Sequence, residues 1–184
     1  MRNRSGILVS SAIAAMVFAS QPALGAFHLW DIVEVYSSAD GSVQFIELST
    51  GSNSQQFLQG HTITASSDGN VLTFTFPTNS PSPTSGRRLL IATPGFSGEV
   101  GAVTPDFVLD SAPFFDPAAG DIIINFGEGA DVQTFSGMQL PDNGLDSLNR
   151  NGASLSLVAP NTPTNFAGDT GEVGDGIFSD GFED

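Results

Sequence analysis

The chain has no cysteine and no lysine, and it has only two histidines, His28 and His61. Without cysteine it can form no disulfide, no cysteine-based metal site and no thiol nucleophile. The histidines form no His-x-x-x-His pair, and no Gly-x-Ser-x-Gly motif occurs, so nothing indicates a serine beside a base. We therefore expect a protein that is not an enzyme and that folds by apolar burial, for which its fifteen phenylalanines are suited.

Positive charge is also scarce, because five arginines stand against twenty acidic residues and the formal net charge is −15. If residues 1–26 are removed, two arginines and no acid are lost, and the net charge becomes −17. Nucleic acid is therefore not an expected partner, since phosphate binding draws on clusters of lysine and arginine. The same repulsion disfavours an anionic membrane surface, whereas divalent cations would be attracted.

The first residues have the layout of a secretory signal peptide. Arg2 and Arg4 precede an apolar stretch, residues 6–19, and small residues follow up to Ala26. The apolar stretch is shorter than the ~20 residues that span a bilayer. We expect residues 1–26 to be cleaved and the mature chain to be secreted, periplasmic or on the cell surface, with no membrane span.

The rest of the chain alternates short β-rich runs with turn residues, and no ten-residue window has a helical period. Asp40-Gly41 and Asp68-Gly69 are placed to close two hairpins. This pattern predicts an all-β antiparallel sandwich. The predicted strands are 28–36, 43–49, 61–66, 70–76, 87–92, 121–126, 131–136 and 154–158.

Three segments interrupt this regularity. Residues 77–86 form a loop rich in proline, serine and threonine. Residues 94–119 mix proline with phenylalanine, which predicts a long ordered excursion packed on the sandwich. Residues 167–184 are acidic and rich in glycine, so we expect a flexible tail that is not needed for folding.

One alternating run, Leu72-Thr73-Phe74-Thr75-Phe76, predicts that Leu72, Phe74 and Phe76 face the core while the threonines face away.

Two groups of short motifs lie about ninety residues apart in the chain: Ile32-Val33-Glu34-Val35, Gln44-Phe45-Ile46-Glu47-Leu48 and Leu58-Gln59-Gly60, and then Gly120-Asp121-Ile122-Ile123-Ile124, Asp131-Val132-Gln133-Thr134-Phe135 and Gly144-Leu145-Asp146-Ser147-Leu148-Asn149-Arg150. Together they resemble the lamin-tail domain family, an immunoglobulin-like β-sandwich that also occurs on secreted bacterial proteins. The resemblance covers roughly residues 28–158, and it implies a fold for residues 27–166 more than an activity. Residues 177–183, Ile-Phe-Ser-Asp-Gly-Phe-Glu, resemble an IF-x-DGFE tail of exported bacterial proteins, chiefly gammaproteobacterial.

Glu34 and Glu47 are the first candidate site residues, because both lie in strands that should pair around Asp40-Gly41. The family pattern has acids at both places. Carboxylates on adjacent strands can act as general acid and base, can hold a cation, or can accept backbone hydrogen bonds in a purely structural role.

Arg150 is the third candidate, at the arginine of the Ser-Leu-x-Arg motif. Its guanidinium is suited to bridging carboxylates or loop carbonyls, and the alternative is a site for an anionic ligand.

No cofactor is expected. Calcium stays open as an alternative, held by the tail acids Asp175, Asp180, Glu183 and Asp184, although residues 169–175 do not fit an EF-hand loop. We predict an exported, non-enzymatic β-sandwich that binds an extracellular or envelope protein or glycan, or attaches to the surface. The alternatives are a secreted hydrolase with a carboxylate pair and a calcium-stabilised surface or matrix component.

Overall fold

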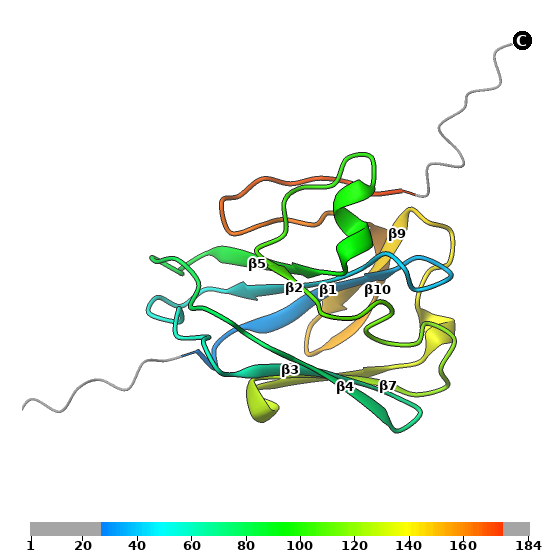
Figure 1. Ribbon diagram of the computed structural model, residues 1–184, viewed down its shortest axis with the longest axis horizontal. Helices are drawn as coiled ribbons and strands as arrows, with labels where there is room; N and C mark the ends of the chain where they lie inside the picture. Colours follow the sequence, from blue (N-terminus) through cyan, green and yellow to red (C-terminus); the bar gives the residue numbers. More distant parts are fainter. Residues whose placement is uncertain (1–26, 175–184) are drawn as a thin grey trace, which may run out of the picture.

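Ten strands and three 3-10 turns make up residues 27–174, the part of the chain that the computed structural model describes (Figure 1). The predicted signal peptide, 1–26, and the last ten residues, 175–184, lie outside it. The strands are β1 (Asp31–Ser37), β2 (Gln44–Thr50), β3 (Thr62–Ser67), β4 (Asn70–Thr75), β5 (Arg87–Ala92), β6 (Phe107–Val108), β7 (Ile122–Phe126), β8 (Asp131–Phe135), β9 (Asp146–Asn151) and β10 (Ser154–Pro160). The turns are η1 (Pro94–Gly98), η2 (Gly127–Gly129) and η3 (Gly137–Gln139).

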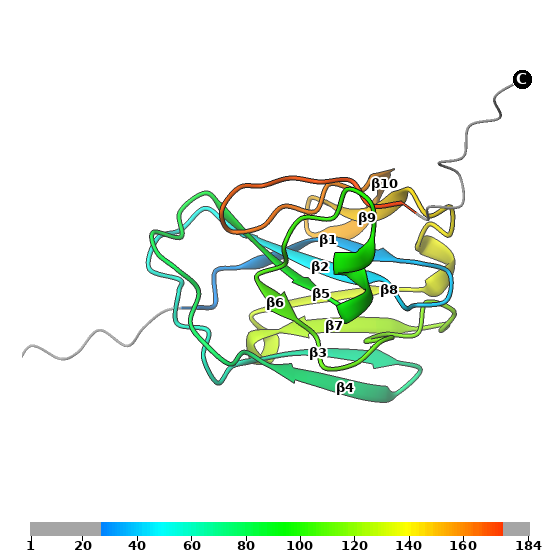
Figure 2. The same ribbon diagram turned by 45° about the horizontal axis from the view of Figure 1, so that its top comes forward.

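The strands form two packed sheets. One has six strands in the order β10-β9-β1-β2-β5-β6, and the other has four in the order β4-β3-β7-β8. Neighbouring strands are antiparallel except β5 and β6, which are parallel. The fold is therefore the predicted all-β, immunoglobulin-like sandwich. Figures 1 and 2 show the two sheets as layers, with β4 at the lower margin.

Both predicted hairpins are present. β1 pairs with β2 around the Asp40-Gly41 turn, and β3 pairs with β4 around Asp68-Gly69. In the second turn, Asp68 and Gly69 both have positive φ, 47° and 88°, which is the geometry that matches the twist of a two-residue hairpin. Local turn chemistry thus sets the register of both strand pairs.

The main core lies between the sheets. Phe74 and Phe76 are 4% and 1% exposed, as the alternation predicted, and their rings meet edge to face at 5.4 Å between centroids. Phe76 makes similar contacts with Phe107 and Phe126. Each such pair adds about 0.5–1.5 kcal/mol to what burial provides.

Leu72 differs from the prediction, because it is 43% exposed instead of buried. It lies on β4, the outermost strand of the four-stranded sheet, and of that strand only Phe74 is buried. The alternating pattern therefore extends beyond the region that the opposite sheet covers.

A second hydrophobic cluster lies on the face of the six-stranded sheet that points away from the other sheet, which we call the outer face. It joins Tyr36, Phe45 and Leu90 to Phe96 and Val173, all buried. Phe96 belongs to the excursion 94–119, which packs on the sandwich as predicted. In Figure 1 η1, at the start of this segment, and the chain after β10 lie over the six-stranded sheet. Burial on both faces explains the unbroken apolar run of β5.

Two strands were not predicted. β9 is polar at every position but one, so it has none of the alternation of apolar and polar residues that marks a strand. A turn at Gly152, where φ is positive, follows it. β6 has only two residues, too few for any periodic signal.

The chain after β10 also differs from the prediction. The flexible tail was expected from residue 167, but residues 167–174 form part of the domain, and Val173 is fully buried. A bridge between Thr164 and Thr170 folds this segment back on itself. The glycines and acids of residues 167–174 suggested disorder, but the burial of Val173 holds this segment on the domain. The rest of the predicted tail lies outside the described residues.

Candidate functional site

The fold brings Glu34 and Glu47 together. They are direct Cα partners across β1 and β2, and their exposed fractions are 1% and 0%. The register runs unbroken from Ser37↔Gln44 at the hairpin turn to this pair, and a bulge in β1 lies just beyond it, between Ile32 and Glu34. Buried carboxylates need hydrogen-bond partners, and both find them on the segment that follows β10.

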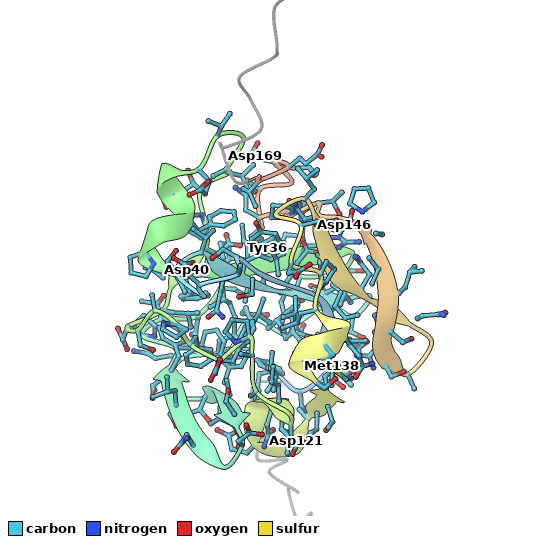
Figure 3. All side chains as sticks on the ribbon, turned by 90° about the vertical axis from the view of Figure 1, so that its right-hand side faces the viewer. Tyr36, Asp40, Asp121, Met138, Asp146 and Asp169 are labelled. Atoms are coloured by element: carbon cyan, nitrogen blue, oxygen red, sulfur yellow. The ribbon has the colours of Figure 1, made fainter. Side chains whose placement is uncertain are left out.

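This segment, residues 161–174, we call the C-terminal strap; it runs above Tyr36 in Figure 3, where Asp169 marks it. One oxygen of Glu34 accepts hydrogen bonds from the Ser147 hydroxyl (2.6 Å) and the Thr162 backbone N–H (2.8 Å). The other accepts from the Thr162 hydroxyl (3.2 Å). Glu34 thereby joins β1, β9 and the strap.

Glu47 does the same two residues further along the strap. One of its oxygens accepts from the Thr164 N–H at 2.6 Å, and the other pairs with the Arg88 guanidinium. Arg88 lies on β5 and is 42% exposed, so the ion pair reaches from the buried face to solvent. Both oxygens of Glu47 are engaged.

Asp106 completes the series. One of its oxygens accepts from the Phe166 N–H (2.9 Å) and from the Leu90 N–H of β5 (2.8 Å). Burial raises the pKa of the Asp106 carboxyl above 3.8, against the lowering effect of these two hydrogen bonds.

Glu34, Glu47 and Asp106 therefore receive the N–H groups of Thr162, Thr164 and Phe166, which alternate along the strap; we call these acids the carboxylate ladder. Three side chains take the place of a paired strand. Asp106 was not predicted as a site residue, because it lies in the irregular excursion and pairs with residues far away in the chain. An acid among the prolines and phenylalanines of that segment was its one visible signal.

Amide side chains and close backbone packing hold the rest of the strap. Asn161 is fully buried; its NH2 donates to the Leu145 and Val173 carbonyls, and its oxygen accepts the Val173 N–H (2.8 Å). A Cβ added at Gly171 would come within 2.1 Å of the Gly101 carbonyl oxygen. Only glycine therefore allows the strap to approach the excursion so closely.

Arg150 lies apart from the two glutamates and links the two sheets. Its Nη1 donates to Asp131 of β8 (2.8 Å) and to the Ile32 carbonyl of β1 (2.9 Å), and its Nε donates to Gly152. Asp131 in turn accepts the Ile32 N–H at 2.7 Å. The guanidinium thus joins β9, β1 and β8 through a planar set of donors.

His61 packs against an aromatic ring, in a structural role. It stacks on Phe27 with 3.5 Å between ring centroids, and its Nδ1 lies 3.2 Å from a Glu128 oxygen. Glu128 also accepts from the Thr62 N–H and hydroxyl. His61 and Glu128 together therefore link Phe27 to η2.

The arrangement has consequences for ligands. The one tryptophan and the one tyrosine of the chain, Trp30 and Tyr36, are 1% and 2% exposed. Within residues 27–174 no three histidine, aspartate or glutamate side chains gather as a metal site would need. In the same span, no helix is long and apolar enough to cross a membrane. The tail acids named as calcium ligands lie outside the described residues.

No protein-family model matches the chain, and no curated protein matches its sequence.

Proposed function

We propose that this chain is an exported, non-enzymatic module of the lamin-tail type that binds a protein of the cell envelope or the surroundings. The carboxylate ladder supports this most directly, because the acids best suited to chemistry are already used to hold the strap. Glu34 and Glu47 lie beneath it with every oxygen bonded, so a substrate would have to displace the strap to reach them.

The burial of Trp30 and Tyr36 disfavours a glycan as the partner, because neither ring is available to stack on a sugar. Trp30 donates its indole N–H to the Gln55 carbonyl, and Tyr36 donates its hydroxyl to the Gly144 carbonyl, both inside the fold. The chain has no other tryptophan or tyrosine that could stack on a sugar.

The strand pairing is compatible with the lamin-tail resemblance. β1 and β2 carry its opening motifs and β9 its closing motif, and β1 lies between the other two in the sheet. The Ser-Leu-x-Arg motif supplies Ser147 to Glu34 and Arg150 to Asp131. The motif residues thus support one another within one part of the sandwich.

Export is tested by the intact mass of protein recovered from the periplasm or medium, which should begin at Ala26 or Phe27. The binding role is tested by cross-linking in the envelope of the producing bacterium, where a specific protein adduct is expected. Pooled polysaccharides provide the opposing test, on wild type and on Glu47→Gln. If folded wild type cleaves a polysaccharide and folded Glu47→Gln does not, the hydrolase alternative replaces this proposal.

A further inference from the structure

The two sheets have four edge strands, and three of them carry features that disfavour further pairing. β6 is only two residues long. β10 has a bulge between Leu155 and Leu157 and ends on Pro160. On β8, the Gln133 side chain reaches across to bind the Leu155 N–H and the Ala153 carbonyl. Bulges, proline and covering contacts are the devices by which proteins protect an edge.

β4 has none of these devices. It is six residues long, contains no charged residue and pairs with β3 in unbroken register from Asn70 to Thr75. Five of its six residues are exposed. β4 is thus an uncharged edge without a bulge, and Figure 2 shows it at the margin of the molecule.

The unpaired backbone groups of β4 can be assigned. The two-residue turn makes Ser67 and Asn70 the first bonded pair, and the Phe76 N–H bonds to the His61 carbonyl. Even-numbered residues of the strand therefore bond to β3. The N–H and C=O groups of Val71, Thr73 and Thr75 point away from the sheet, where a further strand would bond.

Apolar surface accompanies this edge. Leu72 is 43% exposed although the sequence pattern places it on the core face, and Val71, on the opposite face of the same strand, is 60% exposed. Another strand beside β4 would complete the burial that the alternating pattern indicates.

A hollow of about 180 Å³ lies at the turn end of β4. Leu72, Pro113 and Phe114 give it apolar walls, and Asp68 and Asp116 are its two acidic residues. No cation is among its lining residues. The hollow is large enough for one aliphatic side chain, and the acids favour a positive charge beside it.

We infer that β4 accepts an extended segment of a partner protein as a fifth strand of the four-stranded sheet. The segment would carry apolar side chains at alternate positions and lysine or arginine at the end that reaches Asp68 and Asp116. Main-chain hydrogen bonds would supply affinity, and the hollow would supply specificity. This inference rests on the proposed function. A second copy of the chain is a poorer occupant, because both copies carry a large negative charge.

The test uses two synthetic peptides, each with alternating valine and threonine and with either two lysines or two glutamates at one end. We expect the lysine peptide to bind about tenfold tighter at low salt, and the difference to shrink as salt rises. Hydrogen exchange should slow at Val71, Thr73 and Thr75 when it binds. Thr73→Pro should abolish binding without loss of the fold, because the N–H it removes points away from β3. Thr73→Ala keeps that N–H and is the matched control.

Each other outcome overturns the inference. These outcomes are no binding of the lysine peptide at millimolar concentration, equal binding to Thr73→Pro, unfolding of that variant, or a β4-dependent dimer without peptide. Repeating the envelope cross-linking with Thr73→Pro separates the two proposals. A partner retained by this variant leaves the proposed function standing and removes β4 as its site, whereas no partner for either protein removes the proposed function.

Discussion

Replacing Glu47 by glutamine tests whether the carboxylate ladder holds the strap. Glutamine keeps the shape and one oxygen for the Thr164 N–H, but its NH2 group then faces Arg88, which loses its partner. Hydrogen bonds to charged groups contribute about 1.5–3 kcal/mol each. Because Arg88 is 42% exposed, solvent weakens its ion pair with Glu47, and we expect the free energy of unfolding to fall by about 2–4 kcal/mol in total.

In a domain of this size, 1 kcal/mol shifts the melting temperature by about 2–4 °C, so Glu47→Gln should melt roughly 10 °C lower. Hydrogen exchange at the Thr164 N–H should accelerate before exchange in the central strands does, because the strap opens locally. Glu128→Gln is the control: this side chain is 52% exposed and should change stability by less than about 1 kcal/mol. An unchanged melting temperature and unchanged exchange at Thr164 in Glu47→Gln would mean that Glu47 does not hold the strap.

Three further predictions concern the strap and the link between the sheets. Burial raises the pKa of the Asp106 carboxyl, so the folded state binds this proton more readily than the unfolded state does. Wild type should therefore lose stability relative to Asp106→Asn as the pH rises through the raised pKa. Parallel pH profiles of the free energy of unfolding for the two proteins would contradict this. Arg150→Lys keeps the charge but loses the planar guanidinium that binds Asp131, so the free energy of unfolding measured with denaturant should fall by about 1–3 kcal/mol. An unfolding midpoint equal to that of wild type would mean that Arg150 contributes only surface charge. Ending the chain after Gly174 should leave the melting temperature almost unchanged. Ending it after Phe166 removes buried Val173 and should lower the melting temperature by several degrees. Equal melting temperatures of the two truncations would show that residues 167–174 add no stability.

The carboxylate ladder also shows how a sheet can be covered without another strand. Glu34, Glu47 and Asp106 accept N–H groups at every second residue of the strap, the same spacing that a neighbouring strand would use. Side-chain acceptors leave the backbone of the six-stranded sheet to its own pairing. The strap can thus lie across the outer face and seal the second hydrophobic cluster beneath it.

Much of the fold follows from short stretches of sequence. The alternation of residues 70–76 and the Asp-Gly turns at 40–41 and 68–69 specify strands and hairpins, because β periodicity and positive φ are local properties. β9 could not be found in this way, since its residues are polar and it becomes a strand only between β1 and β10. Leu72 was wrongly placed because periodicity shows which face a residue takes, but not whether anything covers that face.

The candidate site could likewise be predicted only in part. Glu34, Glu47 and Arg150 were predicted from the sequence, because acids inside apolar strands and a rare cation can be recognised without knowing their neighbours. Their partners became known from the fold: Glu34 and Glu47 bind strap residues more than a hundred positions away, and Arg150 reaches Asp131 in the other sheet. Asp106 joined them only in three dimensions. Local composition fixes which groups are able to bond, whereas burial and long-range packing fix which partners they meet.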